Sequence, residues 1–376
     1  MNKDWRPDDA RREILRLCHA GLDPLAFRHR VAAQLQRGIP FDAWCWPTAD
    51  PATLLVTGAT GENIPGGKTQ RFFEIEYIEP DFNKFGDLAR QRLSVGVLSR
   101  ASGGELHRSP RYREIFGPAG IGDDLRAALT VDSSTWGYLA LHRDEKIPFT
   151  DYEAAWLGQL APHLAEGMRT SLLITSVEEI DADAGPAIVI LDEQMKIASA
   201  NHSARRWIGE IVGKHAAPDD GLPDPLAAVA ATLVALEREE RDASVPRARV
   251  QTRSGQWLVV HATRLSPLRH GEATGRIAVV MEPARPHELM PLILAAYALT
   301  PRESQITQLV LVGKATNLIA VELAISPLTV QQHLKGVFEK IGVHSKRELA
   351  GRIFAQHFWP RLATNAPLAA DGSYRQ

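Results

Sequence analysis

From about residue 10 to residue 175, short apolar runs typical of strands alternate with segments whose apolar residues have a helical spacing. A long helical pattern begins at Asp151, where Thr150 can serve as N-cap and Trp156, Leu160 and Leu164 recur along one face. Asp132-Ser-Ser134 is typical of a hairpin turn. The short apolar runs around these features predict strands at Ala43–Trp46, Thr53–Thr57, Leu93–Ser99, Leu125–Val131 and Thr135–Leu141.

The middle region, from about residue 180, combines strand-like and helix-like periods. Helical patterns cover Ala204–Ile211 and Pro225–Arg238. The alternating segments predict strands at Ala187–Asp192, Lys196–Asn201, Ala248–Thr252, Trp257–Leu265 and Arg276–Glu282. This order predicts a second small α+β unit. Pro283–Pro286 then interrupts the pattern, and His287–Ala298 is predicted to be a linking helix.

Short helices with strong caps are predicted after Leu299. Thr300-Pro-Arg-Glu303 is a capping box with proline at the first helical position, and Gly313 is a natural helix terminator. Thr316 is positioned to cap a second helix. Ser326-Pro327 opens a third, whose apolar stripe is Val330, Leu334, Val337 and Ile341. Gly342 ends that helix, and Ser345-Lys-Arg-Glu348 is a second capping box that starts a fourth.

The second and third of these helices, joined by Ala324-Ile325-Ser326, predict a helix-turn-helix. In such a motif the later helix enters the DNA major groove. Glutamine can pair with adenine, while lysine contacts guanine or phosphate. We assign base reading to Gln331 and Gln332, phosphate contacts to Lys335 and Lys340, and either a phosphate contact or a packing role to His333. The full set of predicted DNA-binding residues is Thr316, Ser326, Thr329, Gln331, Gln332, His333, Lys335 and Lys340.

Charge is distributed unevenly along the chain. Residues 298–358 hold seven Lys/Arg and four Asp/Glu, a net charge of +3, whereas the whole chain has a net charge of −2. The remainder is therefore at −5. A basic module beside an acidic remainder is the asymmetry expected of a DNA-binding domain attached to a sensor.

The C-terminal segment contains four motifs: Leu299-Thr-Pro-Arg-Glu303, Gly313-Lys-Ala-Thr-Asn-Leu-Ile-Ala320, Ile325-Ser-Pro-Leu-Thr-Val-Gln-Gln-His-Leu-Lys335 and Glu339-Lys-Ile-Gly-Val343. With these motifs the segment resembles the LuxR/FixJ-type helix-turn-helix of bacterial transcription regulators. The resemblance implies a tetrahelical module that binds DNA as a dimer. It departs from the common pattern at Gln331, where lysine or arginine is frequent, and at Leu318, where glutamate is frequent. The first departure affects the expected base preference, and the second suggests a local partner surface.

The upstream regions resemble two sensor folds. The first resembles a GAF domain, and the second resembles a PAS domain, most visibly from Ala187 to Ala204. The expected fold is thus multidomain: a GAF-like α+β domain at 1–175 with an N-terminal helix, a PAS-like α+β domain at 176–285, a linker helix at 286–297, an all-α helix-turn-helix domain at 298–358 and a tail at 359–376. Such sensors hold ligands between sheet and helices, and the candidate pocket residues are Trp44, Trp46, Phe72, Phe73 and Trp136.

Other chemistries find little support. Gly58–Thr69 resembles a phosphate-binding loop, but Glu62 stands where the motif G-x-x-x-x-G-K-[ST] needs its first glycine. Asp8-Asp9 and Asp123-Asp124 precede apolar segments rather than following a strand, so we interpret them as solvated charges and not as a receiver site. The histidines and cysteines show no metal-ligand spacing. His163 or His261 could serve as an axial haem ligand, although an ordinary histidine is far more common. We expect no enzyme activity, no metal and no cofactor.

The predicted function is that of a one-component bacterial transcription regulator. The two cysteines and the lack of a signal peptide or long apolar run predict a cytoplasmic protein with no membrane contact. Expected partners are double-stranded DNA, a second copy of the chain in a homodimer, a small-molecule effector and, as a candidate, RNA polymerase. The alternative is a protein-binding adaptor or a sigma-like factor that uses the helix-turn-helix for a partner rather than an operator.

Overall fold

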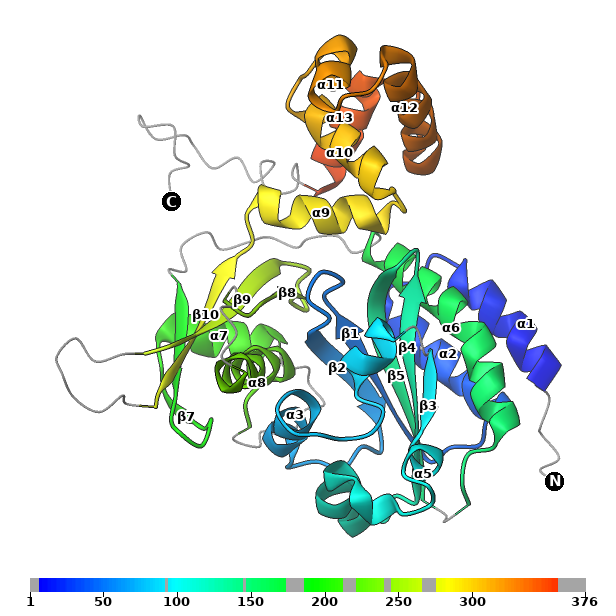
Figure 1. The fold of residues 1–376 in the computed structure, drawn as a ribbon, viewed down its shortest axis with the longest axis vertical. Coiled ribbons are helices and arrows are strands. Elements are labelled where there is room, and N and C mark those ends of the chain that lie inside the picture. Colours follow the sequence, from blue (N-terminus) through cyan, green and yellow to red (C-terminus); the bar gives the residue numbers. More distant parts are fainter. Residues whose placement is uncertain are drawn as a thin grey trace. The chain divides into compact units, whose positions relative to one another are not determined.

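The computed structural model describes residues 7–91, 94–144, 147–173, 186–211, 221–239, 245–265 and 275–357 (Figure 1). Two compact units are present. The first holds the described residues up to Pro283, and the second holds those from Ala284 onward. Among the described residues, no helix is both long enough and apolar enough to span a membrane.

An antiparallel sheet of five strands organises the first half of the first unit, in the order β2-β1-β5-β4-β3. Helices α1 (Pro7–Cys18), α2 (Pro24–Gly38) and α6 (Asp151–Leu172) pack together, and α6 lies against β3, β4 and β5 (Figure 1). Between β2 and β3 the chain forms α3 (Thr69–Tyr77) and α4 (Phe85–Arg90), and α5 (Leu98–Ala101) follows β3. The strands are β1 (Ala43–Ala49), β2 (Val56–Glu62), β3 (Val95–Val97), β4 (Asp123–Val131) and β5 (Ser134–Arg143).

The β4–β5 hairpin and helix α6 confirm two sequence predictions. Asp132 and Ser133 form the turn with φ of 49° and 64°, and Val131 pairs with Ser134. Left-handed backbone at both central residues is the type I′ geometry that matches strand twist. Thr150 caps α6 in a complete capping box with Glu153.

Two predicted strands are displaced. The run Thr53–Thr57 was expected to be a strand, but β2 begins at Val56 and continues through Gly58 and Gly61 to Glu62. The backbone of Leu54 is left-handed (φ 63°) and its N–H donates to the Asp50 carbonyl, so this part of the apolar run forms a turn. Of Leu93–Ser99, only Val95–Val97 is strand; Ser99 lies in α5, and Leu93 lies outside the described residues.

A second antiparallel sheet follows, in the order β7-β6-β10-β9-β8. Counted within each sheet, this is the same order as in the first: second, first, fifth, fourth, third. Both sheets also insert two helices between their second and third strands, which are α7 (His202–Ile211) and α8 (Asp224–Arg238) here. The strands are β6 (Ala187–Leu191), β7 (Ile197–Ala200), β8 (Arg247–Gln251), β9 (Trp257–Arg264) and β10 (Ile277–Pro283).

The two sheets share one hydrophobic core. Tyr138 and Ala140 from the first sheet belong to the same buried cluster as Leu226 and Val250 from the second. Helix α8 packs against α3 and β2. The two topological repeats are thus packed into one compact unit.

The described residues of the second unit form helices and no strands. Helix α9 (Pro286–Ala296) precedes α10 (Pro301–Leu311), α11 (Thr316–Glu322), α12 (Pro327–Ile341) and α13 (Lys346–His357). The caps agree with the sequence: Thr300 and Glu303 form a capping box, and Gly342 ends α12 with a left-handed φ of 73°. Its core consists of residues spaced along the helical stripes, namely Leu294, Leu299, Ile306, Val310, Ile319, Ala320, Val330, Leu334, Val337, Ile341, Val343, Leu349 and Ile353.

Candidate nucleic-acid interface and ligand cavity

The turn between α11 and α12 is built by its own residues. Ala324 adopts a left-handed backbone (φ 51°), which reverses the chain after α11. The Ser326 hydroxyl then accepts the Thr329 N–H at 3.0 Å and caps α12, while Pro327 occupies the first helical position. The Ser326 and Thr329 side chains also hydrogen-bond to each other at 2.8 Å. The start of α12 is therefore stabilised by local contacts among residues 324–329.

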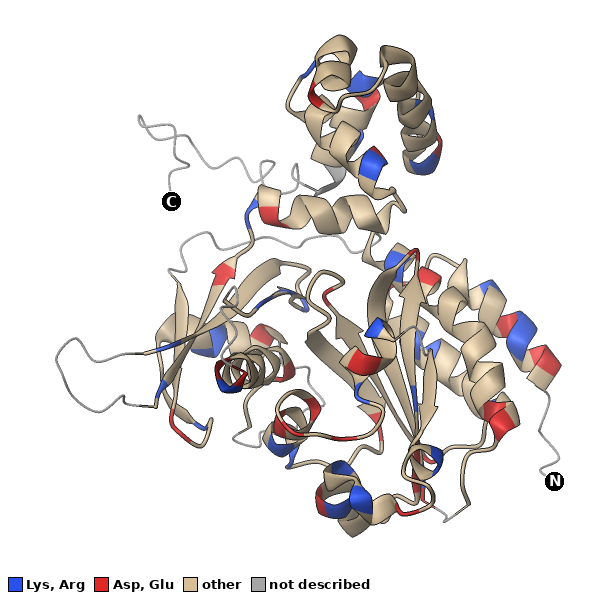
Figure 2. Cartoon of the chain, in the orientation of Figure 1, with Lys and Arg blue, Asp and Glu red and all other residues tan. Residues whose placement is uncertain are grey.

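Helix α12 presents the face that the sequence predicted. Val330, Leu334, Val337 and Ile341 are buried, whereas Gln331, Gln332 and Lys335 are exposed and His333 is half-buried. A helix with one apolar and one polar face can pack on its module and still offer amide and ammonium groups to a major groove. Figure 2 shows charged residues distributed over the helices of this unit.

Two of the residues predicted to contact DNA, Thr316 and Lys340, make side-chain contacts within the module. Thr316 does not cap α11, because Ala315 holds the N-cap position without a side-chain hydrogen bond. The Thr316 hydroxyl accepts a hydrogen bond from the Lys346 ammonium at 2.7 Å, which ties α11 to α13. Lys340 lies 2.6 Å from the Glu303 carboxylate and ties α12 to α10.

Glu303 connects several parts of the module. It is buried, accepts the Thr300 N–H at 2.7 Å and pairs with Lys340. Burial alone would raise the pKa of Glu303, but the hydrogen bonds from Lys340 and Thr300 outweigh that effect and lower it. The carboxylate also lies over Gly336, where an added Cβ would come within 2.8 Å of its oxygen.

The first unit contains a cavity of about 240 Å³. Phe72, Phe73, Phe85 and Phe116 contribute aromatic wall, and the remaining lining residues are Cys45, Pro47, Val56, Ala59, Thr60, Gly61, Ile64, Pro65, Lys68, Thr69, Ile115, Arg126, Ala140, His142 and Asp224. An apolar pocket with a few polar groups is the usual form of a small-molecule site. Phe72 and Phe73 are therefore placed at a cavity, as the sequence predicted.

The three predicted tryptophans do not line this cavity. Alternation along β1 explains two of them, since Cys45 and Pro47 point to the cavity, and Trp44 and Trp46 to the opposite face. The Trp46 indole lies 2.9 Å from the Met168 sulfur of α6. Trp136 is buried elsewhere. The aromatic residue type suggested that the tryptophans line a pocket, but the alternation of side chains along β1 directs Trp44 and Trp46 away from the cavity.

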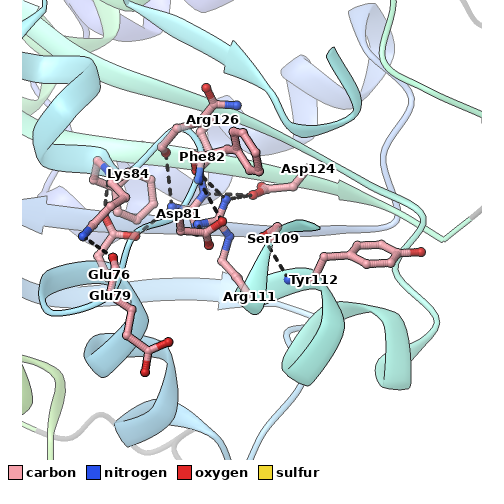
Figure 3. Close-up of polar contacts among 12 residues, drawn as sticks. Glu76, Glu79, Asp81, Phe82, Lys84, Ser109, Arg111, Tyr112, Asp124 and Arg126 are labelled. Atoms are coloured by element: carbon pink, nitrogen blue, oxygen red, sulfur yellow. Dashed lines mark hydrogen bonds and ion pairs between the residues drawn. The ribbon is translucent and has the colours of Figure 1, made fainter. Parts of the chain in front are cut away.

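A buried ionic network adjoins the cavity (Figure 3). The Arg126 guanidinium lies 2.9 Å from the carboxylates of both Glu76 and Asp124. Arg111 lies 2.8 Å from Asp81 and 3.2 Å from Asp124. Burial alone would raise the pKa of Asp124, but the two guanidinium groups outweigh that effect and lower it. Every charge in this network is thus met by an opposite charge.

Asp123 and Asp124 correct a sequence interpretation. We expected solvated charges, but both residues are buried. Asp123 accepts hydrogen bonds from the Ser99 N–H and the Phe149 N–H, and Asp124 is paired as above. Arg126 and His142, which the sequence analysis did not select, interrupt otherwise apolar strands. A charged or titratable residue inside an apolar strand was the sequence feature that could have identified them as buried polar residues.

The phosphate-loop-like stretch does not form a phosphate cradle. Gly58 to Glu62 lie in strand β2, and the Lys68 ammonium donates to the Glu114 carbonyl. His163 is exposed on α6, and His261 is half-buried on β9. Within the described ranges, no three or more His, Cys, Asp or Glu residues are grouped so that they could hold a metal.

The C-terminal module matches a known family. Residues 297–352 match the model described as bacterial regulatory proteins, luxR family. Over 56 residues the chain is 45% identical to the transcriptional regulatory protein UhpA of Escherichia coli (strain K12). The aligned segment makes up 15% of this chain. UhpA of Salmonella typhimurium (strain LT2) matches to the same extent. The chain spans 29% of the length of the curated relatives that it matches. The module is a luxR-family helix-turn-helix, and the family and these relatives are transcriptional regulators, not enzymes.

Solved structures with similar folds include the VqsR LBD domain from Pseudomonas aeruginosa, at 17% identity and a TM-score of 0.33, covering 44% of this chain and 99% of that one. A GAF domain from a phosphoenolpyruvate-protein phosphotransferase of Coxiella burnetii has 19% identity and a TM-score of 0.31, covering 44% and 95%. Escherichia coli SdiA has 13% identity and a TM-score of 0.29, covering 92% and 96%. Because these TM-scores lie below 0.5, the family assignment of the C-terminal module rests on the sequence match.

Proposed function

We propose that this protein is a bacterial transcription regulator that binds operator DNA through α12 and is controlled by a small molecule held in the upstream cavity. The observation that carries the proposal is the exposed face of Gln331, Gln332 and Lys335, on the second helix of a luxR-family helix-turn-helix. Residues of these types at the start of such a helix can reach base edges and phosphates.

Charge favours DNA over a protein partner. Residues 298–358 have a net charge of +3 against −5 for the remainder, and a phosphate backbone is attracted by the former. A sigma-like factor would need a helical promoter-melting domain upstream, whereas the described upstream residues form two five-stranded sheets with flanking helices. Both alternatives are therefore less well supported than an operator-binding regulator.

The upstream unit supplies the sensor in this proposal. The shared strand order of the two sheets supports one architecture used twice, in the GAF-like region at 1–175 and the PAS-like region at 176–285. The cavity lies against the first sheet. An effector controls DNA binding only if it binds the DNA-competent and incompetent states with different affinity. We also propose that the protein acts in the cytoplasm as a homodimer, because one helix-turn-helix reads only a half-site.

The test separates base reading from phosphate contact. A duplex selected by the full-length protein from random sequences is titrated by fluorescence anisotropy at several salt concentrations. Lys335→Ala is expected to weaken binding to all sequences alike and to reduce the slope of log affinity against log salt by about 1. Gln332→Ala is expected to relax preference at one base position, at a cost of about 1–3 kcal/mol for the selected site.

Lys196→Ala, an exposed lysine of the first unit, is the matched control and should leave both quantities unchanged. Identical effects of Gln332→Ala and Lys335→Ala would show that the assigned roles are wrong. Binding that does not fall with rising salt would instead support the adaptor alternative. A stoichiometry of one chain per selected duplex would contradict the dimer.

A further inference from the structure

The cavity of the first unit has the size of a small ligand. Its volume of about 240 Å³ is just below the range of about 300–1,000 Å³ that is usual for ligand pockets. Its walls are mostly aliphatic and aromatic, so the ligand is expected to be largely apolar.

The cations that line the cavity are already engaged. Arg126 is paired with Glu76 and Asp124, and its guanidinium lies over the Phe85 ring at 4.2 Å from the centroid. The Lys68 ammonium donates to the Glu114 carbonyl. His142 is held neutral because burial lowers its pKa to about 4. The lining therefore does not favour an anionic ligand.

In contrast to the cations of the lining, the carboxylate of Asp224 has no charged partner in the part of the chain that the structure describes. It lines the cavity and is half-buried, and desolvation raises its pKa to about 6. Among the described residues, no group hydrogen-bonds or ion-pairs with it. At neutral pH it is thus an ionised carboxylate facing an apolar space. A partly desolvated charge without a protein partner has an energetic cost, and the field of the α8 N-terminus offsets only part of it. A cationic ligand would supply the missing partner.

Asp224 also differs from the other lining residues in its origin. It stands at the start of α8, which belongs to the second sheet, whereas the rest of the lining comes from residues 45 to 142 around the first sheet. A ligand bound to Asp224 would therefore contact both topological repeats at once. Such a ligand can alter how the two repeats pack, which is what an effector needs.

We propose that the cavity binds a small apolar monoamine, with the protonated nitrogen held by Asp224 and the hydrocarbon part packed among Phe72, Phe73 and Phe116. This inference rests on the proposed function and names the chemical class of its effector. A charge-assisted hydrogen bond to the carboxylate provides the selectivity, and the aromatic walls provide most of the buried area.

The test compares three probes of similar size by calorimetry on the full-length protein at neutral pH: phenethylamine, 2-phenylethanol and phenylacetate. Phenethylamine should bind at least about tenfold more tightly than the alcohol, since only the amine can form the charge-assisted bond. Phenylacetate should bind more weakly than either. Asp224→Asn should remove the preference for the amine and leave the affinity for the alcohol nearly unchanged.

Asp224→Asn is expected to fold, because it replaces a half-buried charge that has no partner among the described residues by a neutral group of the same shape. Asp87→Asn, at an exposed carboxylate of the same unit, is the control and should keep the preference. Equal affinities for amine and alcohol, tighter binding of phenylacetate, an unaltered preference in Asp224→Asn, or no binding of phenethylamine would each overturn the inference. Salt-dependent DNA binding, measured on the same preparation, shows separately whether the regulator proposal holds.

Discussion

Glu303 shows how single residues of the helix-turn-helix are divided between structure and binding. Its position in the sequence predicts a capping box, which the structure confirms. The same carboxylate also holds Lys340, a residue that the sequence assigned to phosphate. To bind DNA, Lys340 would have to leave a buried carboxylate without its cation. Lys335 is exposed and makes no hydrogen bond or ion pair with another described residue, so we expect it to be the stronger phosphate ligand.

Lys340→Ala is therefore expected to destabilise the module rather than to change the salt slope of DNA binding. The loss should be about 1–2 kcal/mol, between the values for exposed and buried ion pairs. Native-state hydrogen exchange of α10 and α12 in the full chain measures it. If Lys340→Ala instead reduces the slope of log affinity against log salt by about 1 and leaves hydrogen exchange unchanged, Lys340 contacts phosphate and has no structural role.

Glu303 should also give the module a dependence on pH. Because its pKa is lowered in the folded state, its stabilisation is present above the unfolded pKa of about 4.3 and is lost as pH falls through the folded value. Glu303→Gln should remove this part of the acid sensitivity in the same exchange measurement. Unchanged acid sensitivity in that variant would show that other carboxylates are responsible.

At the scale of an element, the β4–β5 hairpin is held in a tight turn by two residues that are not glycine. Asp132 and Ser133 both have positive φ, which costs about 1–2 kcal/mol for an ordinary L-residue and less for aspartate. Asp132 also forms an ion pair with Arg169 of α6 at 2.9 Å, so it has a role in packing. Ser133 is exposed, so its strained backbone is not offset by an ion pair like that of Asp132.

Ser133→Gly should consequently stabilise the protein by about 0.5–1 kcal/mol, because glycine adopts this backbone without a steric cost. The midpoint of urea unfolding of the first unit is the measurement. Ser134→Gly is the matched control: residue 134 begins β5 with no positive φ, so glycine there should be neutral or destabilising. A lower midpoint for Ser133→Gly would contradict the strain argument.

At the scale of the whole molecule, a buried ion pair joins the two sheets of the first unit. Arg249 of β8 donates to the Asp50 carboxylate at 2.9 Å through its backbone N–H and at 2.5 Å through its guanidinium. The Asp50 side chain is only 3% exposed. Because the pair spans the two repeats, it is one of the contacts through which an effector could act on both.

Asp50→Ala should cost about 3–5 kcal/mol, since it leaves the Arg249 guanidinium without this buried partner. The double change Asp50→Leu with Arg249→Met should cost much less, because neither charge then remains. Calorimetric unfolding of the full-length protein compares these two variants with the parent. A double variant as unstable as the single one would show that packing, and not charge, joins the sheets.

Local patterns predicted much of this protein. The hairpin at Asp132, the cap of α6 at Thr150 and the caps of α10 and α12 depend on residues within a few positions of one another, so the sequence contains the whole interaction. The β2 strand was misplaced because the residues from Gly58 to Glu62 have little apolar character. Their strand conformation comes from pairing with β1, in which Thr60 faces Trp46.

The sequence by itself therefore determined most of the helix-turn-helix: the cap of α12, the turn before it and its outward face are encoded over short distances, whereas the predicted Thr316 cap of α11 is not formed. Only the tertiary structure decided the cavity. Strand parity placed Cys45 rather than Trp44 at its wall, and packing of the second repeat on the first brought Asp224 to residues more than eighty positions away. Such long-range contacts depend on how whole sheets and helices pack, and local residue patterns do not carry that information.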